Sequence, residues 1–139
     1  MVPIKIKKLH PDAIIPKYSH IGDAGMDVYA ISKKETEKFI EYGTGLAFEI
    51  PEQYVMLIFP RSSVTNKDLM LKNSVGVLDS TYRGELILRF NKFGNDNYEE
   101  GERVGQIMII PYPKIEIEEV EELSETARGD GGFGSTGKF

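Results

Sequence analysis

The carboxyl-terminal residues have a composition suited to binding phosphate. Five of the last eleven residues are glycine, and glycine lets backbone N–H groups approach an anion closely. Arg128 and Lys138 add positive charge, and Ser135 and Thr136 add hydroxyl donors. The ring of Phe133 lies among these polar residues, where it could stack on a nucleobase. Taken alone, the segment is equally compatible with a disordered, solvated tail.

Two matches to phosphate-binding motifs in this segment lack the structural context that those motifs require. Gly129-x-Gly131-x-x-Gly134 fits a dinucleotide fingerprint, and Gly132-x-x-x-x-Gly137-Lys138 fits most of a P-loop. Both motifs need a preceding strand and a following helix, because the helix N-terminus supplies the anion site. No such context surrounds them, and Lys138 is followed by Phe139 rather than by Ser or Thr.

Four further segments carry polar groups that could act on such a ligand. They are Ala24–Tyr29, Pro60–Ser63, Asn73–Glu85 and Gly101–Gln106. Each has an ordinary structural interpretation when it is taken alone. Asp27 would be a turn carboxylate and Arg61 a surface ion-pair residue, while Gln106 would be an exposed strand residue. Asp79 and Tyr82 would be turn residues of a hairpin.

Composition narrows the class of protein. The chain has 139 residues, a net charge of −5, a pI near 5.1 and no cysteine. It therefore lacks thiolate zinc sites and disulfides, and its scattered basic residues argue against a nucleic-acid partner. No run of about 18 apolar residues predicts a membrane span, and no signal-like apolar stretch follows Met1, so we expect a cytoplasmic protein. His10 and His20 have no partners at metal-ligand spacing.

Short apolar segments, some alternating with polar residues and some continuous, predict the elements that hold these residues. They are residues 4–9, 46–50, 54–59, 86–90, 107–110 and 115–117. Such strands, separated by turn residues, indicate an all-β sandwich or barrel. The one helix that we expect covers Ser62–Leu69, with Ser62 or Ser63 as its N-cap. Residues 1–126 would form the domain and residues 127–139 a mobile arm.

The five segments together, in this order and spacing, resemble the motifs of the trimeric dUTP pyrophosphatases (dUTPases). The resemblance covers nearly the whole chain, and the Asn73–Glu85 segment and the tail are its specific parts. It implies a distorted jelly-roll barrel or sandwich and hydrolysis of dUTP to dUMP and pyrophosphate. That reaction keeps uracil out of DNA and supplies dUMP for dTMP synthesis. Water would attack the α-phosphorus in line with the leaving pyrophosphate.

The resemblance also implies roles for individual residues. Asp79 would be the general base, and Asp27 would contact Mg²⁺ through water while the substrate phosphates hold the ion. The phosphate-binding residues would be Arg61, Ser62, Ser63, Gln106, Arg128, Ser135 and Thr136. The residues around uracil and deoxyribose would be Asn73, Gly76, Val77, Leu78, Tyr82 and Phe133. A homotrimer would share its sites, with the tail of one subunit closing over the site of another.

Three positions depart from the family pattern. Thr81 stands where Asp or Gly is frequent, Ser63 where Gly is common and Gly105 where Ala is common. The sequence is also compatible with two alternative functions. One is a dCTP deaminase, alone or combined with pyrophosphatase activity, and the other is a nucleotide-sensing or protein-binding module on the same fold.

Overall fold

The computed structural model describes all 139 residues and contains nine strands and one short 3₁₀ helix. The elements are β1 Lys5–Lys8, β2 Met26–Tyr29, β3 Ser32–Glu35, β4 Ile40–Glu49, β5 Tyr54–Phe59, η1 Ser62–Asn66, β6 Leu69–Leu71, β7 Gly76–Leu78, β8 Glu85–Lys92 and β9 Arg103–Pro111. No helix of the structure is long and apolar enough to cross a bilayer. The predicted all-β class is confirmed.

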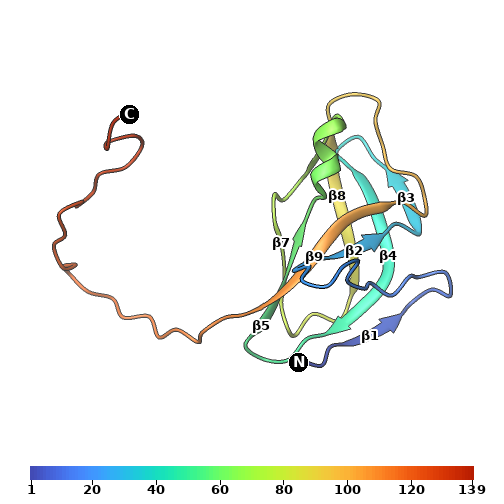
Figure 1. Cartoon of the computed structure of the whole chain (residues 1–139), viewed down its shortest axis with the longest axis horizontal. Coiled ribbons are helices and arrows are strands. Elements are labelled where there is room, and N and C mark those ends of the chain that lie inside the picture. Colours follow the sequence, from blue (N-terminus) through green and yellow to red (C-terminus); the bar gives the residue numbers. More distant parts are fainter.

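Two sheets form the body of the molecule. One has the order β1-β4-β8-β6, with β3 also paired to β4, and the other has the order β2-β9-β5-β7. Every pairing between neighbouring strands is antiparallel. Figure 1 shows the two sheets stacked as an open sandwich rather than a closed barrel.

The core lies between the sheets, where alternate side chains point inward. In β8, Leu86, Leu88 and Phe90 are buried while the residues between them are exposed, as the period of two in a strand requires. The core holds 19 buried residues. At one end Tyr42, Phe90 and Tyr98 form an aromatic cluster with ring centroids 5.7 to 5.8 Å apart. Burial and edge-to-face packing of these rings contribute to the stability of the sandwich.

The short helix differs from the prediction. It is a 3₁₀ helix that spans Ser62–Asn66 only, and its N-cap is Arg61, which makes no capping side-chain bond. Both the predicted end at Leu69 and the predicted serine cap are wrong. The physical reason is that Leu69 begins β6, whose pairing with β8 requires extended backbone from Lys67 onward.

The segment Asn73–Glu85 is not a hairpin. Strand β7 pairs with β5, whereas the following strand β8 pairs with β4 and β6 in the other sheet. The turn after Leu78 therefore crosses between the sheets. Local turn residues suggested a hairpin, but the long-range pairing of β7 decides its sheet.

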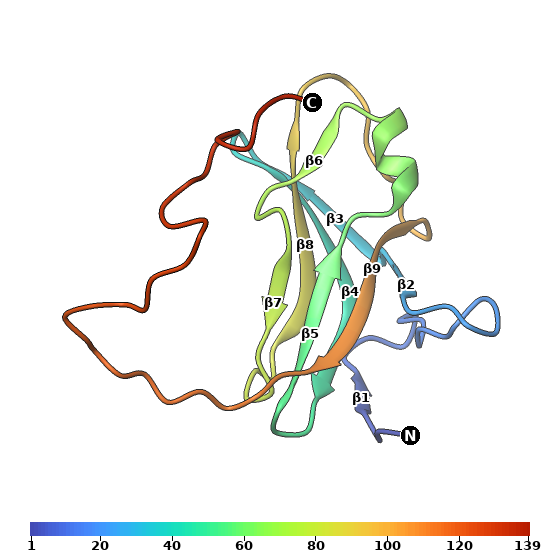
Figure 2. The same cartoon turned by 60° about the vertical axis from the view of Figure 1, so that its left-hand side comes forward.

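The chain leaves the sandwich after Pro111. The predicted strand at residues 115–117 is absent, because Ile115 and Ile117 have no partner strand within one chain and are exposed. The arm, which we define as residues 112–139, runs well away from both sheets in Figure 1, and in Figure 2 its end overlaps the top of the sandwich only in projection. Its backbone bonds from Gly129 to Gly137 join only other arm residues.

Candidate active site

A polar cluster forms where β2, β9 and the end of β5 lie side by side. Asp27 is directly opposite Gln106 across β2 and β9, and Gln106 is opposite Phe59 across β9 and β5. Arg61, two residues beyond β5, donates from Nε to Asp27 Oδ1 at 3.0 Å. Three residues predicted from separate segments of the sequence are thus brought together by strand register.

The side chain of Gln106 is held in place by its surroundings. Its Nε2 donates to the carbonyl oxygen of Pro60 at 3.0 Å. A Cβ on Gly25 would lie 2.8 Å from Gln106 Oε1, so a larger residue at position 25 would displace the amide from its present place. The amide consequently ties β9, which pairs with the strand that carries Asp27, to the turn that carries Arg61.

Arg103 is a member of this cluster that sequence reasoning missed. Its Nη1 donates to Asp27 Oδ2 at 3.3 Å. One carboxylate between two guanidinium groups leaves the cluster positive, although the chain as a whole is acidic. An anion can therefore bind locally in spite of the net charge. Arg103 lies within the Gly101–Gln106 segment, but its contact with Asp27 depends on a register shift after Val28 that places Arg103 opposite Tyr29, and no local pattern predicts that shift.

The predicted serines lie on η1 next to this cluster. Ser62 is exposed, whereas Ser63 is partly buried and its Oγ accepts from Arg61 Nη1 at 3.4 Å. The first turn of η1 is closed by Val64, whose N–H donates to the Arg61 carbonyl at 3.0 Å. Arg61, Ser62 and Ser63 thus form one continuous polar edge.

A second group of predicted residues lines an open cleft of about 370 Å³. The predicted residues in it are Asn73, Gly76, Val77, Leu78, Asp79 and Tyr82. The residues that were not predicted are Ile58, Glu85, Leu86, Ile87 and Arg89. These five come mainly from β8, and their place in the cleft follows from the crossing of the chain between sheets rather than from any local pattern.

Strand β7 gives the cleft a free backbone edge. It is the last strand of its sheet and pairs only with β5, so the N–H and C=O groups on its other side are available to a ligand. Gly76 fits here because a Cβ would lie 2.8 Å from Ile58 Cδ1. An unpaired strand edge can recognise a planar hydrogen-bonding group such as a base.

The turn after β7 fixes Asp79 and Tyr82. The Tyr82 N–H donates to the Asp79 carbonyl at 3.0 Å, and Arg83 Nη1 donates to the Ser80 carbonyl at 2.6 Å. The Tyr82 hydroxyl donates to the Glu85 carbonyl at 3.1 Å, and its ring lies over Gly84, where a Cβ would overlap it. Asp79 itself is exposed at the mouth of the cleft, so its carboxylate is accessible to water.

Asp79, at the mouth of the cleft, lies far along β5 from Arg61 of the same chain. In the pairing of β5 with β7, Leu78 lies opposite Met56, five residues before Arg61. At about 3.3 Å per residue, this places Leu78 roughly 16 Å from Arg61 along the strand, and Asp79 lies farther still. A single chain therefore presents two partial sites.

The predicted arm residues reach neither partial site of their own chain. Arg128 Nε donates to the Gly131 carbonyl at 2.9 Å, within the arm. Phe133 has no shielding from solvent and adopts a φ of 51°. Ser135 and Thr136 are likewise exposed. The structure thus assembles the body residues in two groups and leaves the arm residues apart.

Comparison with known proteins decides the family. A family model described as dUTPase matches residues 11–137. The chain belongs to the dUTPase family. Among curated dUTPases, the deoxyuridine 5'-triphosphate nucleotidohydrolase of Nautilia profundicola is 45% identical over 97% of this chain and 99% of that protein. The corresponding protein of Clostridioides difficile is 43% identical over 99% of both chains.

Solved dUTPase structures agree with this fold. The dUTPase of Staphylococcus bacteriophage 80alpha, in a structure with dUpNHpp, superposes with a TM-score of 0.83 at 29% identity. The match covers 98% of this dUTPase and 99% of the phage protein. The resemblance expected from five short segments is therefore confirmed at the level of the family over the full length of the chain.

Proposed function

We propose that this dUTPase hydrolyses dUTP to dUMP and pyrophosphate by attack of water on the α-phosphorus. The observation that carries the proposal is the cleft, in which an accessible carboxylate, Asp79, stands beside the free edge of β7 and the ring of Tyr82. Membership of the dUTPase family, and relatives named as deoxyuridine 5'-triphosphate nucleotidohydrolases, support the choice of substrate. The reaction removes dUTP from the pool available for DNA synthesis and supplies dUMP for dTMP.

Asp79 acts as the general base. Water is a poor nucleophile, so a carboxylate that orients it and accepts its proton lowers the barrier to attack. The hydrogen bonds of the turn restrict where Asp79 can point, which favours orientation of one water molecule. The pyrophosphate leaves on the side opposite the attacking water.

The positive cluster binds the phosphates. Arg61 and Gln106 donate hydrogen bonds to phosphate oxygens, with Ser62 and Ser63 beside them on η1. These donors stabilise the charge that develops on the leaving pyrophosphate. Asp27 holds Arg61 by its Nε, which leaves the terminal N–H groups of the guanidinium for phosphate, apart from the one on Nη1 that donates to Ser63 Oγ.

The cleft selects uracil and deoxyribose. The edge of β7 from Gly76 to Leu78 offers backbone donors and acceptors to the uracil edge, and Asn73 lies beside it. A thymine methyl group would need space that this close backbone approach does not leave. Tyr82 packs against the deoxyribose, where a 2′-hydroxyl would collide with the ring.

The residues suit a magnesium ion that is carried by the substrate. The chain contains no group of three or more acidic or histidine side chains that could hold a metal by itself. Asp27 is the single carboxylate in the phosphate cluster, and both of its oxygens accept from arginines, which favours a contact with the ion through water. When bound, Mg²⁺ neutralises phosphate charge and usually keeps several waters.

A complete site requires more than one copy of the chain, and we propose a homotrimer. The separation between Asp79 and Arg61 along β5 supports this, since both must contact one triphosphate. The exposed apolar residues of the arm, among them Ile115, Ile117 and Leu123, also support contact with another copy. In the trimer, the phosphate cluster, the cleft and the arm of each site come from different subunits.

The arm closes the site over bound substrate. Phe133 stacks on the uracil, and Arg128, Ser135 and Thr136 donate to the γ-phosphate. Closure excludes competing water from the reacting phosphorus. Without such a role, a fully exposed phenylalanine among glycines has no evident purpose.

A substrate panel tests the proposal. The purified protein is supplied with dUTP, dCTP, dTTP and UTP, with and without Mg²⁺, and the release of pyrophosphate and ammonia is measured. We expect pyrophosphate from dUTP alone, with a strong dependence on Mg²⁺. Ammonia from dCTP would instead indicate the deaminase, and no turnover of any nucleotide would indicate a binding module. A trimer of 3 × 15.7 kDa by light scattering tests the assembly.

A further inference from the structure

Tyr98 carries a buried polar atom that nothing in the reaction described above uses. Its side chain is 2% exposed, and its hydroxyl is the one buried side-chain oxygen or nitrogen that has no hydrogen-bond partner. Burial of an unpaired hydroxyl costs free energy, which substitution by phenylalanine would avoid. The hydroxyl therefore needs an explanation.

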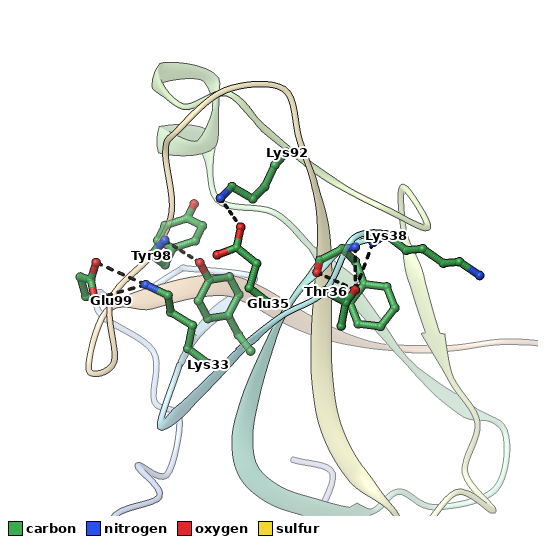
Figure 3. A network of polar contacts seen from close by, with 9 residues as sticks. Lys33, Glu35, Thr36, Lys38, Lys92, Tyr98 and Glu99 are labelled. Atoms are coloured by element: carbon green, nitrogen blue, oxygen red, sulfur yellow. Dashed lines mark hydrogen bonds and ion pairs between the residues drawn. The ribbon is translucent and has the colours of Figure 1, made fainter.

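The ring of Tyr98 is held firmly from several sides. Its backbone N–H donates to the Tyr42 hydroxyl at 2.6 Å, and its ring packs against Tyr42 and Phe90 with centroids 5.7 Å apart. Lys67, which ends η1, places its ammonium 4.9 Å from the ring centroid and also donates to the Asn97 carbonyl at 3.0 Å. Figure 3 shows Tyr98 next to Glu99 on their loop, with a dashed line for the hydrogen bond that the Tyr98 backbone N–H donates to the Tyr42 hydroxyl.

The hydroxyl interacts with two residues of the phosphate cluster, Arg61 and Ser63. Burial raises the pKa of the Tyr98 hydroxyl, while the positive charge of Arg61 and the side chain of Ser63 act to lower it. Both groups are therefore close to it, although the contact with Ser63 falls short of a hydrogen bond. Ser63 Oγ in turn already accepts from Arg61 Nη1 at the long distance of 3.4 Å.

We propose that Tyr98 is a positioning residue, whose rigid hydroxyl donates to Ser63 when substrate binds and so fixes the guanidinium of Arg61 toward phosphate. Asp27 holds Nε of Arg61 but leaves rotation of its terminal nitrogens less restricted. A Ser63 side chain held by Tyr98 removes that freedom, because one terminal N–H is then committed and the others point outward. The inference rests on the proposed function and adds a residue to its phosphate site.

Single substitutions separate this role from simple packing. In Tyr98→Phe the ring remains, and we expect the KM for dUTP to rise about 3- to 10-fold with kcat changed less than twofold, the size of one net hydrogen bond. The affinity for dUpNHpp, measured by calorimetry, falls by the same factor. The melting temperature stays the same or rises, since an unpaired buried hydroxyl has been removed.

Two further variants complete the test. Ser63→Ala should reproduce the rise in KM, and the double variant Ser63→Ala, Tyr98→Phe should be no worse than Ser63→Ala. Tyr42→Phe is the matched control, because it removes a buried hydroxyl from the same aromatic cluster and should lower the melting temperature without changing KM.

The outcomes are distinct. An unchanged KM and dUpNHpp affinity in Tyr98→Phe, a loss confined to kcat or melting temperature, or additive effects in the double variant would overturn the inference while leaving dUTP hydrolysis intact. Absence of pyrophosphate release from dUTP by the unaltered protein would overturn the proposed function and this inference with it.

Discussion

The sandwich and the arm differ in how far contacts within the chain fix their polar side chains. In the sandwich, Asp27 contacts two arginines, and Gln106 is fixed between a carbonyl and a glycine. In the arm, residues 112–139, Arg128 bonds only to a residue three positions away, and Phe133 is fully exposed. The sandwich holds its groups ready before a ligand arrives, whereas the arm has nothing in its own chain to hold it.

This difference indicates in which region a substitution should change stability and activity together. Side chains in the sandwich share contacts with the core, so changes there can affect both folding and activity. Changes in the arm should alter activity while leaving the folding of the sandwich unaffected, because hardly any contact joins the two beyond Tyr112 and Lys114.

The largest effect is expected at the mouth of the cleft. Asp79→Asn should lower kcat by about 10²- to 10⁴-fold, because the amide cannot accept the proton of the attacking water. Since Asp79 is exposed, the melting temperature should be unchanged. Steady-state pyrophosphate release and calorimetry measure the two quantities. Asp12→Asn, at an exposed aspartate near His10, is the control, and parental turnover in Asp79→Asn would remove the general-base assignment.

Removal of residues 127–139 should separate the two regions most clearly. Loss of stacking by Phe133 and of the charge-assisted bonds of Arg128 should lower kcat/KM by about 10²- to 10³-fold. The melting temperature should not change, since these residues contact only one another. A large drop in melting temperature would mean that the arm packs on the sandwich and that the contrast between the regions is wrong.

Two glycines, one in each region, allow the effect of an added side chain on stability to be compared between the sandwich and the arm. Gly105→Ala should lower the free energy of unfolding by about 1–3 kcal/mol, because the added Cβ would overlap Leu88 and lie 2.9 Å from the Phe59 carbonyl oxygen. Gly132→Ala in the arm meets nothing within 4 Å and should be neutral for unfolding. Urea denaturation measures both. Adding Leu88→Val to Gly105→Ala should restore part of the loss, and failure to do so would contradict the packing explanation.

The smallest effect concerns the alkaline stability of the sandwich. Burial raises the pKa of Tyr42 to about 12 from its ordinary value of 10.0. The neutral phenol therefore stabilises the folded state below pH 10, and this contribution is lost as pH rises from 10 through 12. The difference in unfolding free energy between the parent and Tyr42→Phe should shift by about 1–2 kcal/mol over that range. A constant difference from pH 8 to 12 would contradict the assignment.

Local sequence patterns predicted the elements better than their partners. The alternation in residues 86–90 correctly indicated a half-buried strand, and the residues ending at Pro111 indicated β9. The same reasoning wrongly made a hairpin of Asn73–Glu85, since nothing local says that β7 pairs with β5 across the molecule. It also predicted a strand at residues 115–117, where one chain offers no neighbouring strand.

The site residues divide in the same way. Asp79, Tyr82 and Asn73 could be named from one continuous segment that resembles a family motif, and all three line the cleft. Arg103 and Arg89 could not be named, because their approach to the site depends on register and on the crossing between sheets. The Ala-to-Gly departure at position 105 has a physical reason only once Leu88 is seen to fill the space.

The separation between Asp79 and Arg61, measured in the direction of β5, makes a prediction for experiments with two mutant genes. If neighbouring subunits each supply one of these residues, a subunit lacking the base and a subunit lacking the arginine can compensate for each other. Chains carrying Asp79→Asn and chains carrying Arg61→Ala are each expected to be inactive alone. When they are co-expressed, mixed assemblies would regain activity, because some sites then combine an unaltered Asp79 with an unaltered Arg61. Complementation between two defective alleles would then report the architecture of the assembly without any structure being determined.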